Sequence, residues 1–255
     1  MSLLNEIRGL EPEACWVASI SVSSVNGQLP EGLLSPAEQA ALGRFSREAD
    51  RMRHALGRAL ARVLLGGRCN ELPSQVPLTV DAHGKPVVEG GTVSFSIAHG
   101  ADAVVVACAP VGAVGIDVEA VDRPVQALRL ARHFFHAEEV GFIEGGEERM
   151  EARFLKIWTA KEAYLKAIGL GLRLPLRSFA IAVDSSARGR VVGGPEGPRE
   201  IRWCHPVAGH LAALCAELME PAIHLQLEVK GGWRGELRIR TVGPISQDER
   251  WPDAF

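Results

Sequence analysis

The sequence lacks the usual marks of several common protein classes. It has only five cysteines in 255 residues, with no Cys-x-x-Cys pair and no Cys/His spacing of the kind that binds zinc. Because the cysteines are few, odd in number and scattered along the chain, we predict free thiols and a reducing compartment. Cys108 and Cys215 lie in apolar runs, where burial is expected. No P-loop sequence occurs either. A disulfide scaffold, a zinc module and a P-loop nucleotide hydrolase are therefore not expected.

Long hydrophobic runs and an excess of one charge are also missing. The longest apolar stretch, residues 103–116, is broken by Pro110 and two glycines and is too short for a membrane span. The first ten residues carry Glu6 and Arg8 in place of an apolar core, so no signal peptide is predicted. The net charge of −3 gives no general affinity for nucleic acid. We expect a cytoplasmic protein that binds neither membrane nor nucleic acid.

The composition is that of a globular protein with a large core. Hydrophobic residues make up 47% of the chain and charged residues 23%. Patterns typical of helices and of strands occur both before and after about residue 112, which favours an α/β (α+β) fold with two similar lobes. We predict lobes at 1–112 and 113–220, and an extension at 221–255 that contains a hairpin.

Residues 154–169 predict a helix, because they include no proline and few β-branched residues and end at a glycine. On a helical wheel Lys161 and Glu162 fall inside the apolar side, and Lys166 lies at its edge. Burying a lone carboxylate is costly, so Glu162 needs a counter-charge or a metal ion. The alternative is a plain ion pair with Lys166 one turn later, worth about 0.2–0.5 kcal/mol.

Residues 114–119 predict a strand whose interior carries two acidic side chains. Asp117 and Glu119 are two positions apart and therefore face the same side. Neighbouring carboxylates repel unless a cation lies between them, and such oxygen ligands suit Mg²⁺. The alternative is a strand end that dips into solvent.

A second long helix, predicted at residues 44–65, is rich in arginine. One face carries four of them, which form either a solvated surface or a docking patch for an acidic partner: Arg47, Arg51, Arg58 and Arg62. Arg53 lies on the opposite, apolar side. Because its guanidinium is never neutral, Arg53 is expected to face a fixed anion.

Two groups of histidines are weaker candidates. His99 ends a predicted strand at 93–100, where it is either a polar terminus or a functional group. His133, His136 and Glu139 lie on a predicted helix at 127–142, and we interpret the two histidines as surface residues in preference to ligands of a metal cluster.

Two segments together resemble the signature of a known family. Residues 115–119 (Gly-Ile-Asp-Val-Glu) are followed about forty residues later by 158–166 (Trp-Thr-Ala-Lys-Glu-Ala-Tyr-Leu-Lys). This pair resembles the 4′-phosphopantetheinyl transferases, in particular the larger, monomeric, surfactin-synthetase-activating type with a Trp-x-x-Lys-Glu-Ala motif. Further landmarks match in order, and the likeness spans roughly residues 35–217. Ala98 replaces a serine of many relatives, and Glu38 and Ala41 replace lysines of some.

The resemblance implies two α/β lobes related by a pseudo-twofold axis, with coenzyme A and Mg²⁺ in the cleft between them. It also implies residue roles. The metal-binding carboxylates are matched by Asp117, Glu119 and Glu162, and the lysine near the reacting phosphates by Lys166. The groups that hold the 3′-phosphate and the adenosine end of coenzyme A are matched by Arg53, Lys85 and His99.

The implied reaction is Mg²⁺-dependent phosphoryl transfer. The 4′-phosphopantetheine arm of coenzyme A moves to a serine of an apo acyl or peptidyl carrier protein, and adenosine 3′,5′-bisphosphate leaves. Glu162, Lys166 and Asp117 are the expected catalytic residues, with Glu162 as the base. Carriers of fatty-acid, polyketide and nonribosomal peptide synthesis all fit this expectation. The alternatives are a Mg²⁺-dependent pyrophosphate hydrolase and a non-catalytic module that binds coenzyme A or a carrier protein.

Overall fold

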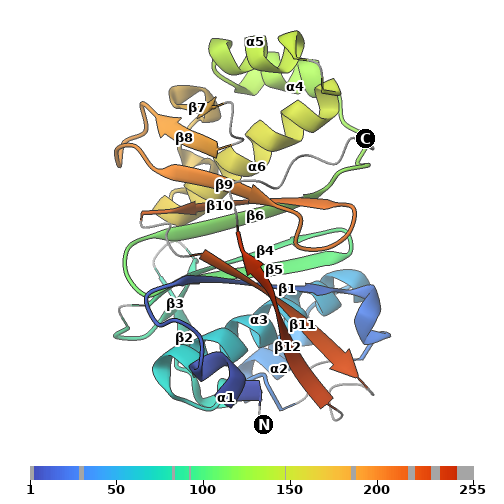
Figure 1. Cartoon of the computed structure of the whole chain (residues 1–255). Coiled ribbons are helices and arrows are strands. Elements are labelled where there is room, and N and C mark those ends of the chain that lie inside the picture. Colours follow the sequence, from blue (N-terminus) through green and yellow to red (C-terminus); the bar gives the residue numbers. More distant parts are fainter. Residues whose placement is uncertain are drawn as a thin grey trace.

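Two stacked β-sheets with helices on their outer faces form the body of the protein (Figure 1). The computed structural model describes residues 3–28, 32–81, 84–91, 93–146, 148–184, 188–217, 222–230 and 236–245. The mixed α/β architecture predicted from the sequence is confirmed. The boundaries of the three predicted segments stay a prediction.

The first sheet has the strand order β12-β11-β1-β5-β4. Its strands are β1 (Cys15–Ser21), β4 (Ser94–Gly100), β5 (Ala103–Ala109), β11 (Ala222–Lys230) and β12 (Glu236–Pro244). β1 pairs antiparallel with β5 and parallel with β11. A small hairpin, β2 (Leu78–Val80) and β3 (Pro86–Val88), lies beside β4. Short helical segments complete this part of the chain: α1 (Leu3–Arg8), η1 (Ser23–Val25) and η2 (Pro73–Gln75).

Helix α3 (Glu48–Cys69) packs on the outer face of the first sheet. It begins and ends four residues later than predicted. Its predicted apolar face is buried, with Met52, Leu56 and Leu60 each at most 4% exposed. These side chains form one core with Trp16 and other residues of the sheet.

The predicted four-arginine face of α3 is not a uniformly solvated surface. Arg62 is 2% exposed and its Nε lies 2.6 Å from a carboxylate oxygen of Glu38. It also donates to the carbonyls of Pro73 and Val76. Arg62 is buried because α2 (Pro36–Leu42) packs against α3. Helix α2 begins after Ser35, which forms a capping box with Glu38.

The second sheet has the order β6-β10-β9-β8-β7. Its strands are β6 (Val114–Ala120), β7 (Ala180–Val183), β8 (Arg188–Val192), β9 (Glu200–Cys204) and β10 (His210–Ala216). Helix α6 (Met150–Ile168) lies on its outer face and forms a core with strands β7 to β10. The turns η3 (Gly171–Arg173) and η4 (Leu176–Ser178) follow α6.

The single helix predicted at 127–142 is wrong, because the chain forms two helices there. These are α4 (Ala127–Phe134) and α5 (Ala137–Gly145), separated by an extended Phe135. The backbone N–H of His136, which caps α5, donates to Glu139. Glu139, by contrast, is buried, at 1% exposed.

A third cluster of apolar side chains joins the two sheets. It includes Val105 and Ala98 from the first sheet and Ile116 and Leu214 from the second. Along one edge β4 meets β6, where the Ser96 hydroxyl accepts a hydrogen bond from the Ile116 N–H at 3.2 Å. This contact fixes the end of β4 beside the end of β6.

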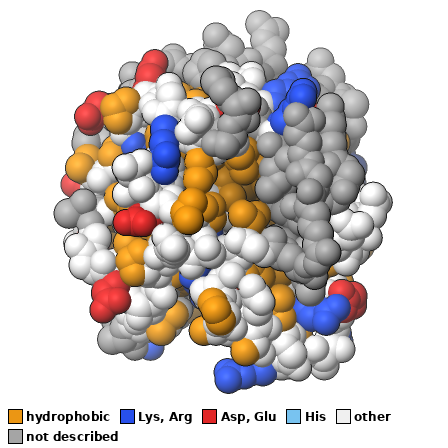
Figure 2. Space-filling model, turned by 90° about the horizontal axis from the view of Figure 1, so that it is seen from below, with side chains coloured by type: hydrophobic (Ala, Val, Ile, Leu, Met, Phe, Trp, Pro, Cys, Tyr) orange, Lys and Arg blue, Asp and Glu red, His pale blue; other side chains and the backbone are white. Residues whose placement is uncertain are grey.

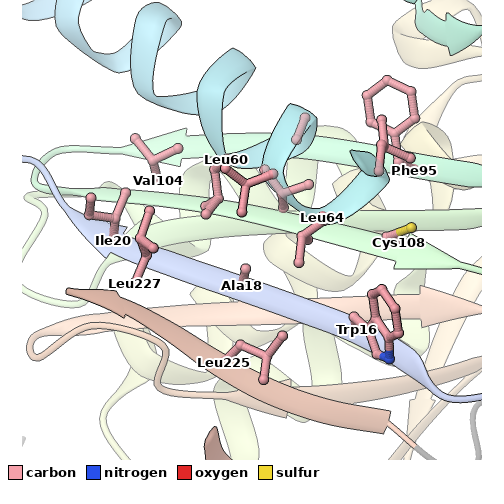
Figure 3. Packing of buried hydrophobic residues seen from close by; sticks show 14 of the residues in the cluster. Trp16, Ala18, Ile20, Leu60, Leu64, Phe95, Val104, Cys108, Leu225 and Leu227 are labelled. Carbon is pink, nitrogen blue, oxygen red and sulfur yellow. The ribbon is translucent and has the colours of Figure 1, made fainter. Parts of the chain in front are cut away.

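The C-terminal strands complete the first sheet and its core. β11 and β12 form the predicted hairpin, whose turn at 231–235 lies outside the described residues. Leu225 and Leu227 of β11 reach the same core as Leu60 and Leu64 of α3 (Figure 3). The predicted extension therefore contributes two strands to the first sheet, and the pattern within it does not reveal β1 as its partner strand.

The surface around α1 to α3 mixes side chains of several kinds. A central strip of hydrophobic side chains is surrounded by separate acidic and basic ones (Figure 2). Over the side chains that the figure colours, the basic residues form no continuous patch. None of the helices in the described residues is long and apolar enough to cross a membrane.

Candidate active site

Glycine in the 115–119 motif lets helix α6 approach strand β6 at backbone distance. A Cβ atom on Gly115 would collide with the carbonyl of Ala163 and the N–H of Ala167. The strand and the helix therefore pack without a side chain between them at this point. This contact places Glu162 and Lys166 of α6 beside the acidic end of β6.

Asp117 and Lys166 form the central ion pair of the site. Lys166 Nζ lies 2.7 Å from Asp117 Oδ1, and Asp117 is 8% exposed. Burial raises the pKa of Asp117 above its ordinary value, while Lys166 lowers it and Glu119 raises it further. The second oxygen, Oδ2, is buried and has no hydrogen-bond partner among the described residues. This orphaned acceptor is free for a cation or a donor.

Glu119 and Glu162 complete a carboxylate cluster, the name used here for Asp117, Glu119 and Glu162. Burial raises the pKa of Glu162, and the charges of Asp117 and Glu119 raise it further, opposed by Lys166. Glu119 also pairs with Arg123, four residues later in the loop after β6. The three carboxylates thus repel one another electrostatically, as expected of groups that share a cation.

The donor chemistry of the cluster fits a hard cation such as Mg²⁺. Asp117 Oδ2 is an unsatisfied buried oxygen, and oxygen donors with repelling charges favour such ions. Within the described ranges, however, no three His, Cys, Asp or Glu side chains are gathered as a set that could hold a metal ion. The structure therefore supplies carboxylate oxygens that suit a metal ion, but these side chains are not gathered into a complete set of metal ligands.

A pocket of about 390 Å³ lies next to this cluster and is shared by the two halves of the chain. Helix α3 and strand β4 form one wall, the turn before β3 forms another, and α6 and the loop after it form the third. All four residues predicted to hold coenzyme A line it: Arg53, Lys85, His99 and Lys166. The structure brings these four together, although they come from four separate segments.

Lys85 and Arg53 are held in place by neighbouring groups. Lys85 Nζ donates to the carbonyl of Lys166 at 2.7 Å, at the C-terminus of α6, and burial lowers the pKa of Lys85. Arg53 lies 2.6 Å from Asp50 and donates to the carbonyl of Ala101. The carboxylate that Arg53 faces in the structure is thus Asp50 of its own helix, and its contact with a ligand anion stays a prediction.

His99 lies at the exposed mouth of the pocket. Partial desolvation lowers its pKa, and the positive charges of Lys166 and Arg53 lower it further. A lowered pKa favours the neutral imidazole, which can accept or donate one hydrogen bond. His99 therefore adds polarity to the pocket without a fixed charge.

Lys161, inside the same motif as Glu162, points away from the pocket. It is fully buried and lies 2.9 Å from Glu139, and it donates to the carbonyls of Leu176 and Phe179. Sequence reasoning missed this role. The helical spacing held a signal, because consecutive residues point about 100° apart and cannot both face one site.

Comparisons with known proteins agree with this geometry. Residues 113–215 match the family model of the 4′-phosphopantetheinyl transferase superfamily, and residues 28–111 match that of the 4′-phosphopantetheinyl transferase N-terminal region. The chain is 34% identical over 147 residues to a putative 4′-phosphopantetheinyl transferase of Synechocystis, covering 56% of this chain and 59% of that protein. It is 32% identical over 172 residues to a phosphopantetheinyl transferase of Thraustochytrium, covering 62% and 60%.

The chain spans about three fifths of the length of these two relatives. A third relative is matched more completely: the 4′-phosphopantetheinyl transferase HetI of Nostoc is 34% identical over 169 residues, which cover 64% of this chain and 70% of that protein. The resemblance seen in the sequence is thus confirmed, and the chain belongs to the 4′-phosphopantetheinyl transferase superfamily.

Proposed function

We propose that this chain transfers the 4′-phosphopantetheine arm of coenzyme A to a serine hydroxyl of an apo carrier protein. The observation that carries the proposal is the Asp117–Lys166 pair, which joins a cationic pocket to the carboxylate cluster. The pocket offers positive charge to the phosphates of a nucleotide, and the cluster offers oxygen atoms at the place where they would react. Family membership supports the same activity.

In the proposed reaction the pocket holds the nucleotide end of coenzyme A. Arg53 and Lys85 would bind its phosphates, and His99 would donate a hydrogen bond at the mouth. The chain's main contribution is to position these groups and to offset their charge, as in other phosphoryl transfers.

The chemical step forms one phosphorus–oxygen bond and breaks another. The serine oxygen of the carrier attacks the β-phosphorus of coenzyme A, the bond from that phosphorus to the bridging oxygen breaks, and adenosine 3′,5′-bisphosphate leaves. Glu162 would accept the serine proton, because its carboxylate lies beside Lys166 and Asp117 at the place where the phosphate would react. Lys166 would offset the negative charge on the leaving phosphate.

Asp117, Glu119 and Glu162 would hold a Mg²⁺ ion in the working enzyme. When bound, the ion supplies positive charge beside the diphosphate. Lys166 would then exchange its contact with Asp117 for one with the phosphate, which the flexible lysine stem permits.

The partners of the reaction are acyl or peptidyl carrier proteins and coenzyme A. We further propose that the chain acts as a monomer in the cytoplasm. The pocket is built from one chain alone, and all five cysteines are free thiols, which favours a reducing compartment.

Intact-mass spectrometry of an apo carrier protein tests the proposal directly. The carrier is incubated with this protein, coenzyme A and Mg²⁺, with a parallel sample in EDTA. We expect the mass to rise by one phosphopantetheine arm in the first sample only. An unchanged carrier with cleaved coenzyme A would instead identify a pyrophosphate hydrolase. An unchanged carrier with intact coenzyme A, across acyl and peptidyl carriers, would identify a binding module.

A further inference from the structure

The turn between β4 and β5 supports the pocket from behind its lining. It consists of Ala101 and Asp102 alone, since Gly100 pairs directly with Ala103. Arg53, which lines the pocket, donates from Nη1 to the carbonyl of Ala101 at 3.2 Å. A backbone atom of this turn therefore helps to hold the guanidinium in place, so the position of the guanidinium depends on that of the turn.

The Asp102 carboxylate ties the turn to the end of β1 and to η1. Its Oδ1 accepts from the Ser23 N–H at 2.7 Å. Its Oδ2 accepts from the hydroxyls of Ser21 and Ser23 at 2.5 and 2.9 Å. Burial raises the pKa of Asp102, but these hydrogen bonds lower it more, so the group is a carboxylate at neutral pH. The three bonds are therefore charge-assisted and stronger than bonds between neutral groups.

The backbone of the turn meets both sheets. The Asp102 carbonyl accepts from the Val22 N–H at 2.7 Å, and the Asp102 N–H donates to Nε2 of His210, at the start of β10, over 3.4 Å. Gly100, just before the turn, packs against β6, where a Cβ atom would meet the carbonyl of Val118 at 2.7 Å. The turn thus lies beside the strand that carries two members of the carboxylate cluster.

Loss of the Asp102 carboxylate would loosen the turn without removing it. The main-chain contact with the residue before η1 would remain. The hydroxyls of Ser21 and Ser23 would lose their acceptor, and the turn would no longer be fixed against them. The Ala101 carbonyl could then shift, and Arg53 would sample more rotamers, because a long side chain gives up that freedom only where a contact repays it.

We propose that Asp102 is a positioning residue for the binding of coenzyme A: it fixes the β4–β5 turn so that the Ala101 carbonyl keeps Arg53 in place in the pocket. This rests on the proposed function, because coenzyme A is taken as the ligand. Asp102 is not part of the pocket lining and acts through Arg53. Its effect should therefore appear in the affinity for coenzyme A and disappear when the arginine is removed.

Isothermal titration with coenzyme A tests this in a double-mutant cycle. Asp102→Ala should weaken binding by about three- to tenfold, the effect of one lost hydrogen-bonding anchor. In the Arg53→Ala background the same change should weaken binding by less than about twofold, since the two residues act as one unit. Asp184→Ala is the matched control. Asp184 also fixes a turn, by accepting from the Arg188 N–H after β7, but it lies at the opposite edge of the second sheet from β6 and should leave the affinity unchanged.

An equal loss of affinity in both backgrounds, or no loss in either, would overturn the role of Asp102. Circular dichroism checks that each variant is folded. If Asp102→Ala is not, the double variant Ser21→Ala/Ser23→Ala removes two of the donors to the carboxylate and should give the same dependence on Arg53. In the transfer assay, Asp102→Ala should raise the KM for coenzyme A by the same factor and change kcat by less than about twofold.

The wild-type protein separates this proposal from the transferase activity. Binding of coenzyme A that depends on Asp102 through Arg53, with no transfer to any carrier, would refute only the transferase. Transfer by the wild type, together with equal losses of affinity in the two backgrounds, would refute only the positioning role.

Discussion

The ammonium of Lys161 lies 2.9 Å from a carboxylate oxygen of Glu139, and neither side chain is more than 1% exposed. Glu139 also accepts a hydrogen bond from the Ile181 N–H, at the start of β7. The pair therefore ties α5, α6 and the second sheet together at one buried point. Because Glu162 and Lys166 follow on the same helix, this point supports the position of the active-site groups.

Removing one member of this pair should destabilise the protein strongly. Lys161→Met leaves the Glu139 carboxylate buried without its counter-charge, which costs about 3–5 kcal/mol. Urea unfolding would measure the change in the free energy of unfolding. The double variant Lys161→Met/Glu139→Leu should recover much of the loss, since it leaves no unpaired charge. A double variant no more stable than Lys161→Met would show that the pair itself is not the source of the effect.

Gly115→Ala should disturb the approach of α6 to β6. The added methyl group would meet the backbone at Ala163 and Ala167, which cannot move aside without shifting the helix. Overpacking of this kind costs about 1–3 kcal/mol, so we expect a lower melting temperature and weaker transfer. Gly141→Ala is the control: a Cβ there meets nothing within 4 Å, and α5 should tolerate it. Equal melting temperatures for the two variants would contradict the close contact at Gly115.

Glu162→Gln should stabilise the metal-free protein while abolishing transfer. Folding raises the pKa of Glu162, so between its ordinary and its raised pKa the folded state binds more protons than the unfolded state. Stability therefore falls as the pH rises through that window, and the neutral glutamine removes the penalty. We expect a melting temperature higher by about 2–4 °C at neutral pH, the shift that corresponds to about 1 kcal/mol.

Added Mg²⁺ should make the wild type melt at a higher temperature than the Glu162→Gln variant. The ion binds the folded wild type and relieves the repulsion within the carboxylate cluster, so its melting temperature should rise with Mg²⁺ concentration. The Glu162→Gln variant should respond much less. A wild type whose melting temperature ignores Mg²⁺ would count against the metal role of the cluster.

Asp117→Asn should reduce transfer by at least about a hundredfold and keep the fold. The amide is similar in shape to the carboxylate but carries no charge for Lys166 or for a metal ion. The rate constant for transfer, from the carrier mass assay, gives the size of the loss, and circular dichroism verifies the fold. Asp122→Asn, at an exposed position just after β6, is the matched control and should be as active as the wild type.

Local patterns predicted the parts of the site that depend on one element at a time. The period of two in β6 placed Asp117 and Glu119 on the same side of the strand. The apolar face of α3 was also correct. In each case the sequence pattern spans a single helix or strand, and the geometry of that element determines which side chains share a face.

Features that depend on contacts between distant elements escaped prediction. Arg62 was expected on a solvated surface or a docking patch, because nothing in its own helix indicates that Glu38 and α2 cover it. The strands β8 and β9 were missed, since their short, mixed patterns gain their meaning only from the neighbouring strands. Lys161 was seen among apolar residues, but its partner Glu139 comes from another helix.

The parallel pairing of β11 with β1 has a consequence for the order in which the chain can fold. During synthesis the strands of the first sheet before residue 112 leave the ribosome early, but their inner neighbour β11 emerges only after the whole second sheet. Until then β1 exposes an open edge, and the core around Leu60 and Leu64 lacks Leu225 and Leu227. The sheet whose strands are made first is therefore completed only by two strands made after the second sheet.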